Sequence, residues 1–208
     1  MYTPPHHSST DLAWLDWLAE HHAFGTLISQ SDGAPFATPL PVLYERTGTE
    51  VVLSGHWARP NPQWRDIEGQ RALFIFQGPH AYISPRWYPD IRNKVPTWNY
   101  LTAHVYGKIR ITHEDTELER IVVALARKFE AGAATPWTLA DSGPDTHALF
   151  RGIVGFELRA ESVQIKPKLG QNQPVVNVEG AMAGLRDPGS AEAAAVAALM
   201  QQELQRRQ

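Results

Sequence analysis

The feature that most constrains the fold is a long run of alternating side chains between Tyr100 and Thr112. Val105 and Ile109 alternate there with Lys108 and Arg110. Because successive side chains of a strand point to opposite faces, this period of two predicts one long strand with a buried and an exposed side. The chain is therefore expected to be built around a β-sheet.

Shorter strand patterns lie on both sides of this run. Asp32-Gly33 between two apolar segments is a hairpin signal. Gly78-Pro79 is predicted to join two separate short strands. In chain order, the predicted strands cover residues 25–29, 36–43, 51–54, 72–76, 81–84, 100–112 and 153–165.

Helical patterns stand at both ends and late in the chain. Residues 118–129 have one apolar face, with acidic residues before it and basic residues near its end, which suits the helix dipole. Thr10 and Ser190 are positioned as N-caps of terminal helices. Asn61 before Pro62 predicts the cap of a short helix that reaches about residue 68. The sequence thus indicates a mainly β, α+β protein, an antiparallel barrel with flanking helices in a single domain over 1–208.

Composition narrows the functional classes. The 208 residues are 43% hydrophobic and 20% charged, which is typical of a soluble globular protein. A net charge of −3 argues against general affinity for nucleic acid, and the absence of cysteine excludes disulfides, thiolate catalysis and Cys-based metal sites. We find neither a signal peptide nor an apolar run of membrane-spanning length, so a cytoplasmic protein without a membrane partner is expected.

Aromatic residues concentrate between Gly55 and Gly107, where four of the seven tryptophans lie. Rings next to proline-rich loops can form the walls of a pocket for a planar ligand. Packing in a core or an interface is the alternative, and it is the more usual role of any single ring.

Arg59 lies just before the predicted Asn61 helix. Free N–H groups at a helix start attract anions, and a guanidinium adds paired donors that suit a phosphate. The alternative is an ion pair with a nearby carboxylate, Asp66 or Glu68.

Other kinds of site lack support in the sequence. His56, His80 and His104 have no metal-binding spacing, and Ser84 precedes a proline and does not form a nucleophile elbow. The glycines form neither a dinucleotide fingerprint nor a P-loop. We therefore assign no catalytic residue and no metal ligand.

Three segments resemble the signature blocks of the PaiB-type FMN-binding negative transcriptional regulators. They are residues 55–64 (GHWARPNPQW), 76–88 (FQGPHAYISPRWY) and 95–100 (VPTWNY). The N-terminal residues up to Leu27 and the late segment 168–172 (KLGQN) are also similar, so the resemblance covers nearly the whole chain. The sequence departs from the family pattern at His7, commonly Phe, at Gly170, usually Ser, and at Gln173, usually basic.

The resemblance implies an antiparallel split β-barrel of the pyridoxamine-phosphate-oxidase-like kind, usually a homodimer with FMN at the interface. Arg59 and the backbone of 58–61 would take the phosphate, and residues 38–40 would line the isoalloxazine ring. Thr102, with Trp98 or Asn99 of the other subunit, would complete the pocket. The full set of expected cofactor contacts is Thr38, Pro39, Leu40, His56, Ala58, Arg59, Asn61, Trp98, Asn99, Thr102, Lys168, Gln171 and Asn172.

The sequence and its family resemblance suggest two functions. The first is an FMN-binding transcriptional regulator, for which the family name suggests promoter DNA as a partner, although the chain shows no recognisable DNA-reading helix. The alternative is an FMN-dependent oxidoreductase of the same superfamily, with His56 or His104 as proton donor. Haem is the less favoured alternative cofactor.

Overall fold

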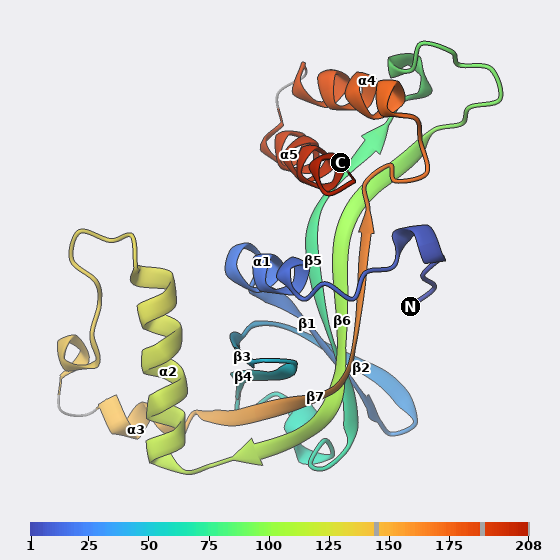
Figure 1. The fold of residues 1–208 in the computed structure, drawn as a ribbon. Coiled ribbons are helices and arrows are strands. Elements are labelled where there is room, and N and C mark those ends of the chain that lie inside the picture. The colour runs from blue at the N-terminus through green and yellow to red at the C-terminus, as the bar shows by residue number, and fades with distance from the viewer. Residues whose placement is uncertain (144–145, 188–189, 208) are drawn as a thin grey trace. The chain divides into compact units, whose positions relative to one another are not determined.

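The computed structural model describes residues 1–143, 146–187 and 190–207. Within them the chain forms a seven-stranded antiparallel sheet in the order β2-β1-β5-β6-β7-β4-β3 (Figure 1). The strands are β1 (Phe24–Ser31), β2 (Ala34–Pro41), β3 (Leu43–Thr47), β4 (Glu50–Ala58), β5 (Arg71–Ile83), β6 (Thr97–Thr112) and β7 (Ile153–Lys168). The α-helices are α1 (Ala13–His21), α2 (Asp115–Glu130), α3 (Thr146–Phe150), α4 (Val175–Arg186) and α5 (Ala191–Gln205). Short 3-10 turns are η1 (Pro5–His7), η2 (Pro62–Arg65), η3 (Pro85–Trp87) and η4 (Leu139–Ser142).

The chain divides into two compact units. The first unit comprises residues 1–18, 77–103 and the described residues from 164 onward; the second comprises 19–76 and 104–163. The strands β5, β6 and β7 each contribute residues to both units. The sequence-based expectation of a single domain stays a prediction, and each unit is described below by itself.

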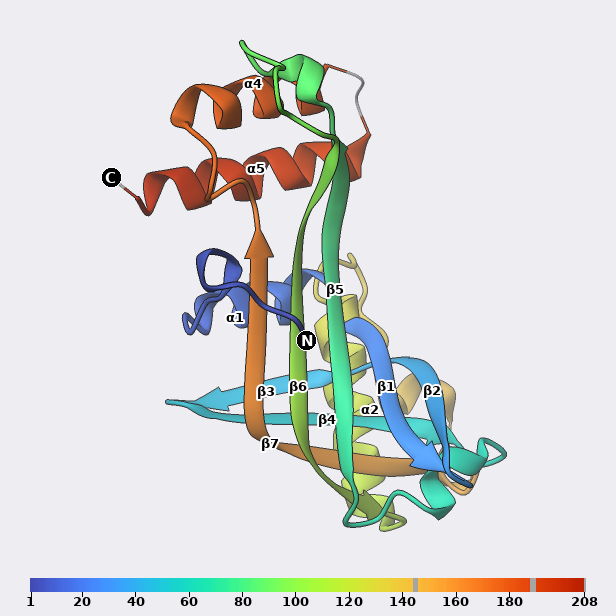
Figure 2. The same ribbon diagram turned by 90° about the vertical axis from the view of Figure 1, so that its right-hand side faces the viewer.

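The second unit contains two hairpins, β1–β2 and β3–β4 (Figure 2). The Asp32-Gly33 turn of the first has positive φ at both residues, which fits the predicted hairpin signal. Trp57 and Phe156 contact each other in the core, with ring centroids 4.6 Å apart and the ring planes tilted by 41°. Gly107 is required by close approach, since a Cβ there would overlap the main-chain carbonyl of Arg159.

The first unit contains the helical pair α4 and α5, which pack side by side (Figures 1 and 2). Both helices bury a stripe of apolar side chains, among them Val178 and Leu185 of α4 and Val196 and Met200 of α5. Because these side chains leave water together, the pair has a core of its own.

The predicted class, an antiparallel sheet with flanking helices, is confirmed, but two strand predictions are wrong. The strand predicted over 36–43 ends at Pro41 as β2, and Leu43–Thr47 forms the separate strand β3, which was not predicted. Residues 72–76 and 81–84 are not two strands joined by a turn at Gly78-Pro79, since β5 runs through both as one element. Gly78 and Pro79 are buried in it, and a Cβ on Gly78 would lie 2.9 Å from the carbonyl oxygen of Leu101. Close packing of neighbouring backbone has overridden the local turn preference.

The helix predictions differ mainly at their ends. Ser190 caps α5, accepting from Ala193 N at 3.0 Å, as predicted. Thr10 is not the cap of α1, because the carboxylate of Asp11 accepts from Ala13 N at 2.9 Å and the helix starts there. The helix α4 was not predicted. No helix among the described residues combines the length and the apolar character needed to cross a membrane.

Candidate functional site

The residues expected to contact a cofactor fall into two groups, one in each unit. Thr38, Pro39, Leu40, His56, Ala58, Arg59 and Asn61 belong to the second unit. Trp98, Asn99, Thr102, Lys168, Gln171 and Asn172 belong to the first. The surroundings of each group decide what its side chains can bind.

Arg59 follows β4 and is half-buried against the start of β7. Its Nε donates to the carbonyl of Arg151 at 2.5 Å, and Nη2 donates to the carbonyl of Ile153 at 2.8 Å. Arg59 therefore binds main-chain carbonyls and does not form the ion pair with Asp66 or Glu68 that the sequence left as an alternative. A guanidinium has five N–H donors, so three remain after these two bonds, enough for a phosphate.

Asn61 connects the end of β4 to β2. Its Oδ1 accepts from Gln63 N at 2.9 Å, which confirms the predicted cap. Its Nδ2 donates to Thr38 Oγ1 at 3.0 Å, and this bond joins positions 23 residues apart. The family resemblance assigned both residues to the flavin separately, and the structure brings them into contact.

The helix that follows Asn61 is a single 3-10 turn, Pro62–Arg65, instead of a helix reaching residue 68. Asn61 N donates to the carbonyl of Ala58 at 2.9 Å, and Arg59 N to that of Gly152 at 2.8 Å. The prolines at 60 and 62 have no N–H. The amides of Arg59 and Asn61 are therefore used within the chain, which leaves the Arg59 side chain as the main donor for a phosphate here.

The three predicted residues of β2 do not present one surface. Leu40 is buried at 4% exposure, Thr38 is half-buried and Pro39 is exposed. This follows from the alternation of side chains along a strand. Of the three residues of β2, Thr38 has a polar side chain, and that side chain lies next to the loop of Arg59 because it bonds Asn61.

His56 lies on a face of β4 that α2 covers. It pairs with Gly155 of β7, and a Cβ on Gly155 would meet Leu118 of α2 at 2.9 Å. Burial lowers the pKa of His56, so the ring is neutral at neutral pH. Its Nδ1 and the hydroxyl of Ser54 are buried and have no hydrogen-bond partner among the described residues.

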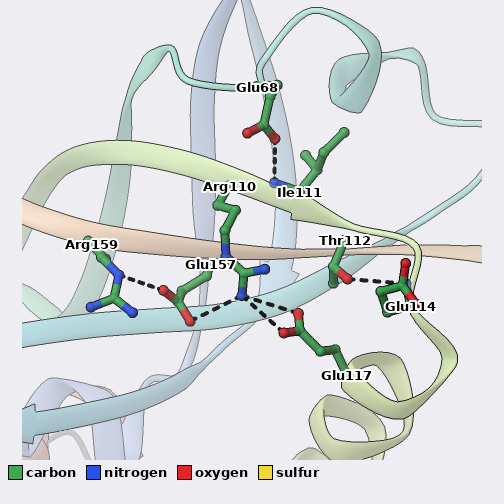
Figure 3. A network of polar contacts seen from close by, with 8 residues as sticks. All are labelled: Glu68, Arg110, Ile111, Thr112, Glu114, Glu117, Glu157 and Arg159. Carbon is green, nitrogen blue, oxygen red and sulfur yellow. Dashed lines mark hydrogen bonds and ion pairs between the residues drawn. The ribbon is translucent and has the colours of Figure 1, made fainter.

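Beside this face, an ion-pair network fastens α2 to the sheet (Figure 3). Arg110 of β6 bonds Glu117 of α2 at 3.1 Å and lies 3.6 Å from Glu157 of β7. Arg159 pairs with the other oxygen of Glu157 at 2.8 Å. The hydrogen bond to Glu117 is the main cause of the raised pKa of Arg110. We interpret the network as structural, since each of its charges lies next to an opposite charge.

In the first unit, Asn99, Lys168 and Asn172 line a polar cavity of about 270 Å³. Lys168 Nζ donates to Thr97 Oγ1 at 2.5 Å and to the carbonyl of Trp98 at 2.6 Å. Gln171 shapes the neighbouring loop, since its Oε1 accepts from Leu169 N at 2.8 Å and lies 3.1 Å from His7 Nδ1.

Sequence reasoning missed Lys94, which also lines this cavity. It lies in a proline-rich loop with no regular period, so no local pattern distinguishes it from an ordinary exposed lysine.

Trp98 and Thr102 line a second hollow of the first unit, of about 350 Å³. Trp98 is 52% exposed and lies 6.2 Å, centroid to centroid, from the exposed ring of Tyr82 on β5. Large exposed rings at adjacent positions are typical of interaction surfaces. Among the described residues, no group of three His, Asp or Glu side chains is placed to hold a metal ion.

Solved structures identify the class of fold. The FAD- and haem-binding protein from Mycobacterium smegmatis matches 86% of this chain and 80% of its own, with a TM-score of 0.59 and 21% identity. The flavocytochrome Anf3 from Azotobacter vinelandii matches 77% of this chain and 68% of its own, with a TM-score of 0.56 and 12% identity. At such identities the likeness concerns the fold alone, and it agrees with the split-barrel class expected from the sequence.

Sequence comparison then gives the family. Residues 1–162 match the family model described as "Putative FMN-binding domain". Protease synthase and sporulation protein PAI 2 from Bacillus subtilis is 33% identical over 208 residues, 99% of each chain. This chain therefore belongs to the FMN-binding family of the PaiB type, which confirms the resemblance and the expected cofactor class.

The residues of the second unit fit FMN in donor chemistry. Arg59 retains N–H groups for a phosphate, and the Asn61–Thr38 pair adds polar groups next to it. Bound FMN would supply a ring that accepts and returns electrons. The assignment of individual side chains to the flavin stays a prediction.

Proposed function

We propose that the protein is an FMN-dependent negative regulator of transcription of the PaiB type, acting as a homodimer with FMN at the subunit interface. The observation that carries this proposal is the similarity to PAI 2 along 99% of both chains. A match of that extent includes both groups of expected contact residues.

Arg59 is the proposed phosphate ligand, and Asn61 and Thr38 are proposed to lie along the ribityl chain and ring. The guanidinium is fixed by two main-chain carbonyls, so it needs little ordering when the phosphate arrives. A preorganised donor of this kind increases affinity because less conformational entropy is lost on binding.

The test is reconstitution of the purified protein with FMN, followed by absorption spectroscopy and thermal unfolding. We expect a bound flavin spectrum and a melting temperature that rises with FMN concentration, because a ligand of the native state stabilises it. The spectrum also separates FMN from haem. Flavin absent from the protein fraction, with no thermal shift, would refute the cofactor assignment.

Arg59→Ala should weaken FMN binding by about 1.5–3 kcal/mol through loss of a charged hydrogen bond. Arg120→Ala is the matched control, since Arg120 is exposed on α2. Isothermal titration measures both. Equal affinities of the two variants would mean that the phosphate binds elsewhere.

Regulation is tested by binding to the promoter DNA of the protein's own gene over a series of salt concentrations. With a net charge of −3, we expect specific binding without strong general affinity. If the regulatory function is correct, scrambled DNA of the same length binds much more weakly than the promoter DNA. No binding at any salt concentration would remove the regulatory proposal while leaving the flavin result intact.

The oxidoreductase alternative is tested on the same flavin-loaded sample. Rapid mixing with NADH or NADPH bleaches a flavin that accepts hydride. His56, one of the two candidate proton donors, is half-buried beneath α2 and its pKa is lowered by burial, which does not favour it as a donor. Fast bleaching would favour the enzyme over the regulator.

A further inference from the structure

The polar cavity of about 270 Å³ in the first unit is lined by positively charged side chains without negative ones among the described residues. Its described lining includes two lysines, Lys94 and Lys168, together with neutral amides and hydroxyls, and no Asp or Glu. Burial is the main cause of the lowered pKa of Lys168, and the nearby charge of Lys166 adds to it. A cavity with this lining favours anions.

Neither lysine has a carboxylate partner among the described residues. Lys168 Nζ donates to a hydroxyl and a carbonyl, and Lys94 Nζ donates to Gln173 Oε1 at 3.3 Å. Asp90, whose pKa Lys94 helps to lower, is already bound by Arg92 through both carboxylate oxygens, at 2.8–3.1 Å. The two positive charges are thus not neutralised by a carboxylate among the described residues of the unit.

A buried amide points to the same conclusion. Asn99 lines the cavity at 4% exposure, and its Nδ2 donates to the thioether sulfur of Met200 at 3.3 Å. Sulfur is a weak acceptor, so this buried donor lacks a strong partner. The twelve-residue helix α4 also begins directly after the cavity residue Gln173 and its flanking proline, and a helix start favours negative charge.

The size of the cavity limits what it can hold. Pockets for drug-sized ligands usually span about 300–1,000 Å³. At about 270 Å³ this cavity is smaller than that range, and a whole flavin nucleotide exceeds it. A compact anion of a few heavy atoms fits.

We propose that this cavity is a binding site for a small anion with phosphate or carboxylate oxygens, held by Lys94 and Lys168 and distinct from the flavin site. This gives Lys168, Asn99 and Asn172, which the sequence resemblance assigned to FMN, a different ligand. Under the proposed function, such a site lets a second ligand, besides the flavin, affect the activity of the protein. The inference stands on the cavity itself and does not require that FMN binds.

The test is titration of the full-length protein with inorganic phosphate and with malonate, against sodium chloride at equal ionic strength. We expect a saturable rise in melting temperature with at least one of the two anions and none with chloride. Lys94→Gln should raise the dissociation constant by about tenfold or more, as loss of a charged hydrogen bond requires. Lys168→Met should do the same, and Lys108→Gln, an exposed lysine of the second unit, should change nothing.

Repeating the titration with FMN-loaded protein separates a free anion from the phosphate of the flavin. If the sites are distinct, the dissociation constant for the anion is unchanged and Lys94→Gln binds FMN normally. Competition by FMN but not by riboflavin would show that the cavity holds the flavin phosphate and would overturn the proposal. So would the absence of a saturable shift with both anions, or equal effects of Lys94→Gln and Lys108→Gln.

Discussion

At the scale of single residues, Asn61 shows how one side chain serves two elements. It caps the turn Pro62–Arg65 through Gln63 N and ties that turn to β2 through Thr38. Both bonds lie in the second unit, so their loss acts on its stability regardless of any ligand.

Asn61→Ala should lower the free energy of unfolding by about 1 kcal/mol through the lost cap, with a smaller addition from the lost bond to Thr38. Urea denaturation measures it. Thr38→Val is the companion variant, because it removes the second bond and keeps the cap. If Asn61→Ala is as stable as the parent protein, the capping bond contributes nothing.

His7 should make stability depend on pH. Burial, the largest cause, lowers its pKa from 6.5 to about 4. Between these values the unfolded chain binds a proton that the folded protein does not, so stability rises with pH across this window and falls as pH drops toward 4.

His7→Phe should reduce the loss of stability between pH 6.5 and about 4, relative to the parent protein. His113→Phe is the control, since that ring is exposed. Thermal unfolding at several pH values gives both curves. Parallel curves for His7→Phe and the parent would contradict the assignment.

At the scale of elements, α4 carries a feature that sequence analysis passed over. Gly180 and Gly184 lie one turn apart, and Trp87 of η3 packs into the space that their missing side chains leave. The spacing of the two glycines was visible in the sequence, but the tryptophan that fills the groove was not.

Gly184→Ala should therefore destabilise the protein by about 1–3 kcal/mol, because the added methyl group overlaps the Trp87 ring. The better helix propensity of alanine offsets part of that cost. Gly132→Ala, where no atom lies within 4 Å of the added Cβ, is the control in the same denaturation experiment. A stabilised Gly184→Ala would mean that Trp87 moves away freely.

At the scale of the whole molecule, two exposed aromatic residues bear on the oligomeric state. Trp98 and Tyr82 stand exposed at 52% and 45% on the sheet of the first unit, with their rings in edge contact. Aromatic side chains of this size are enriched at subunit interfaces.

We expect a homodimer in sedimentation equilibrium, and Trp98→Glu should shift it toward monomer because a charge is costly in a buried interface. Lys108→Glu is the control for an added negative charge elsewhere. A monomer at all concentrations tested, with and without FMN, would refute the dimer.

Much of the fold was predictable from local patterns. The alternation around Tyr100–Thr112 and the amphipathic residues of α2 identify their elements because burial imposes a period on the sequence. The caps at Asn61 and Ser190 were predictable because they depend on neighbouring residues only. The strand β5 was split in error because Gly78 packs closely against Leu101 of β6, which is distant in sequence.

The sequence by itself determined most of the strands, the family and the cofactor class, since these depend on local residue order and on long matching segments. Tertiary structure alone decided that Arg59 binds main-chain carbonyls, that Asn61 meets Thr38, and that Lys94 and Lys168 share a cavity without a carboxylate. The reason is physical. A side chain's partners are set by which distant segments fold against it, and no local period records them.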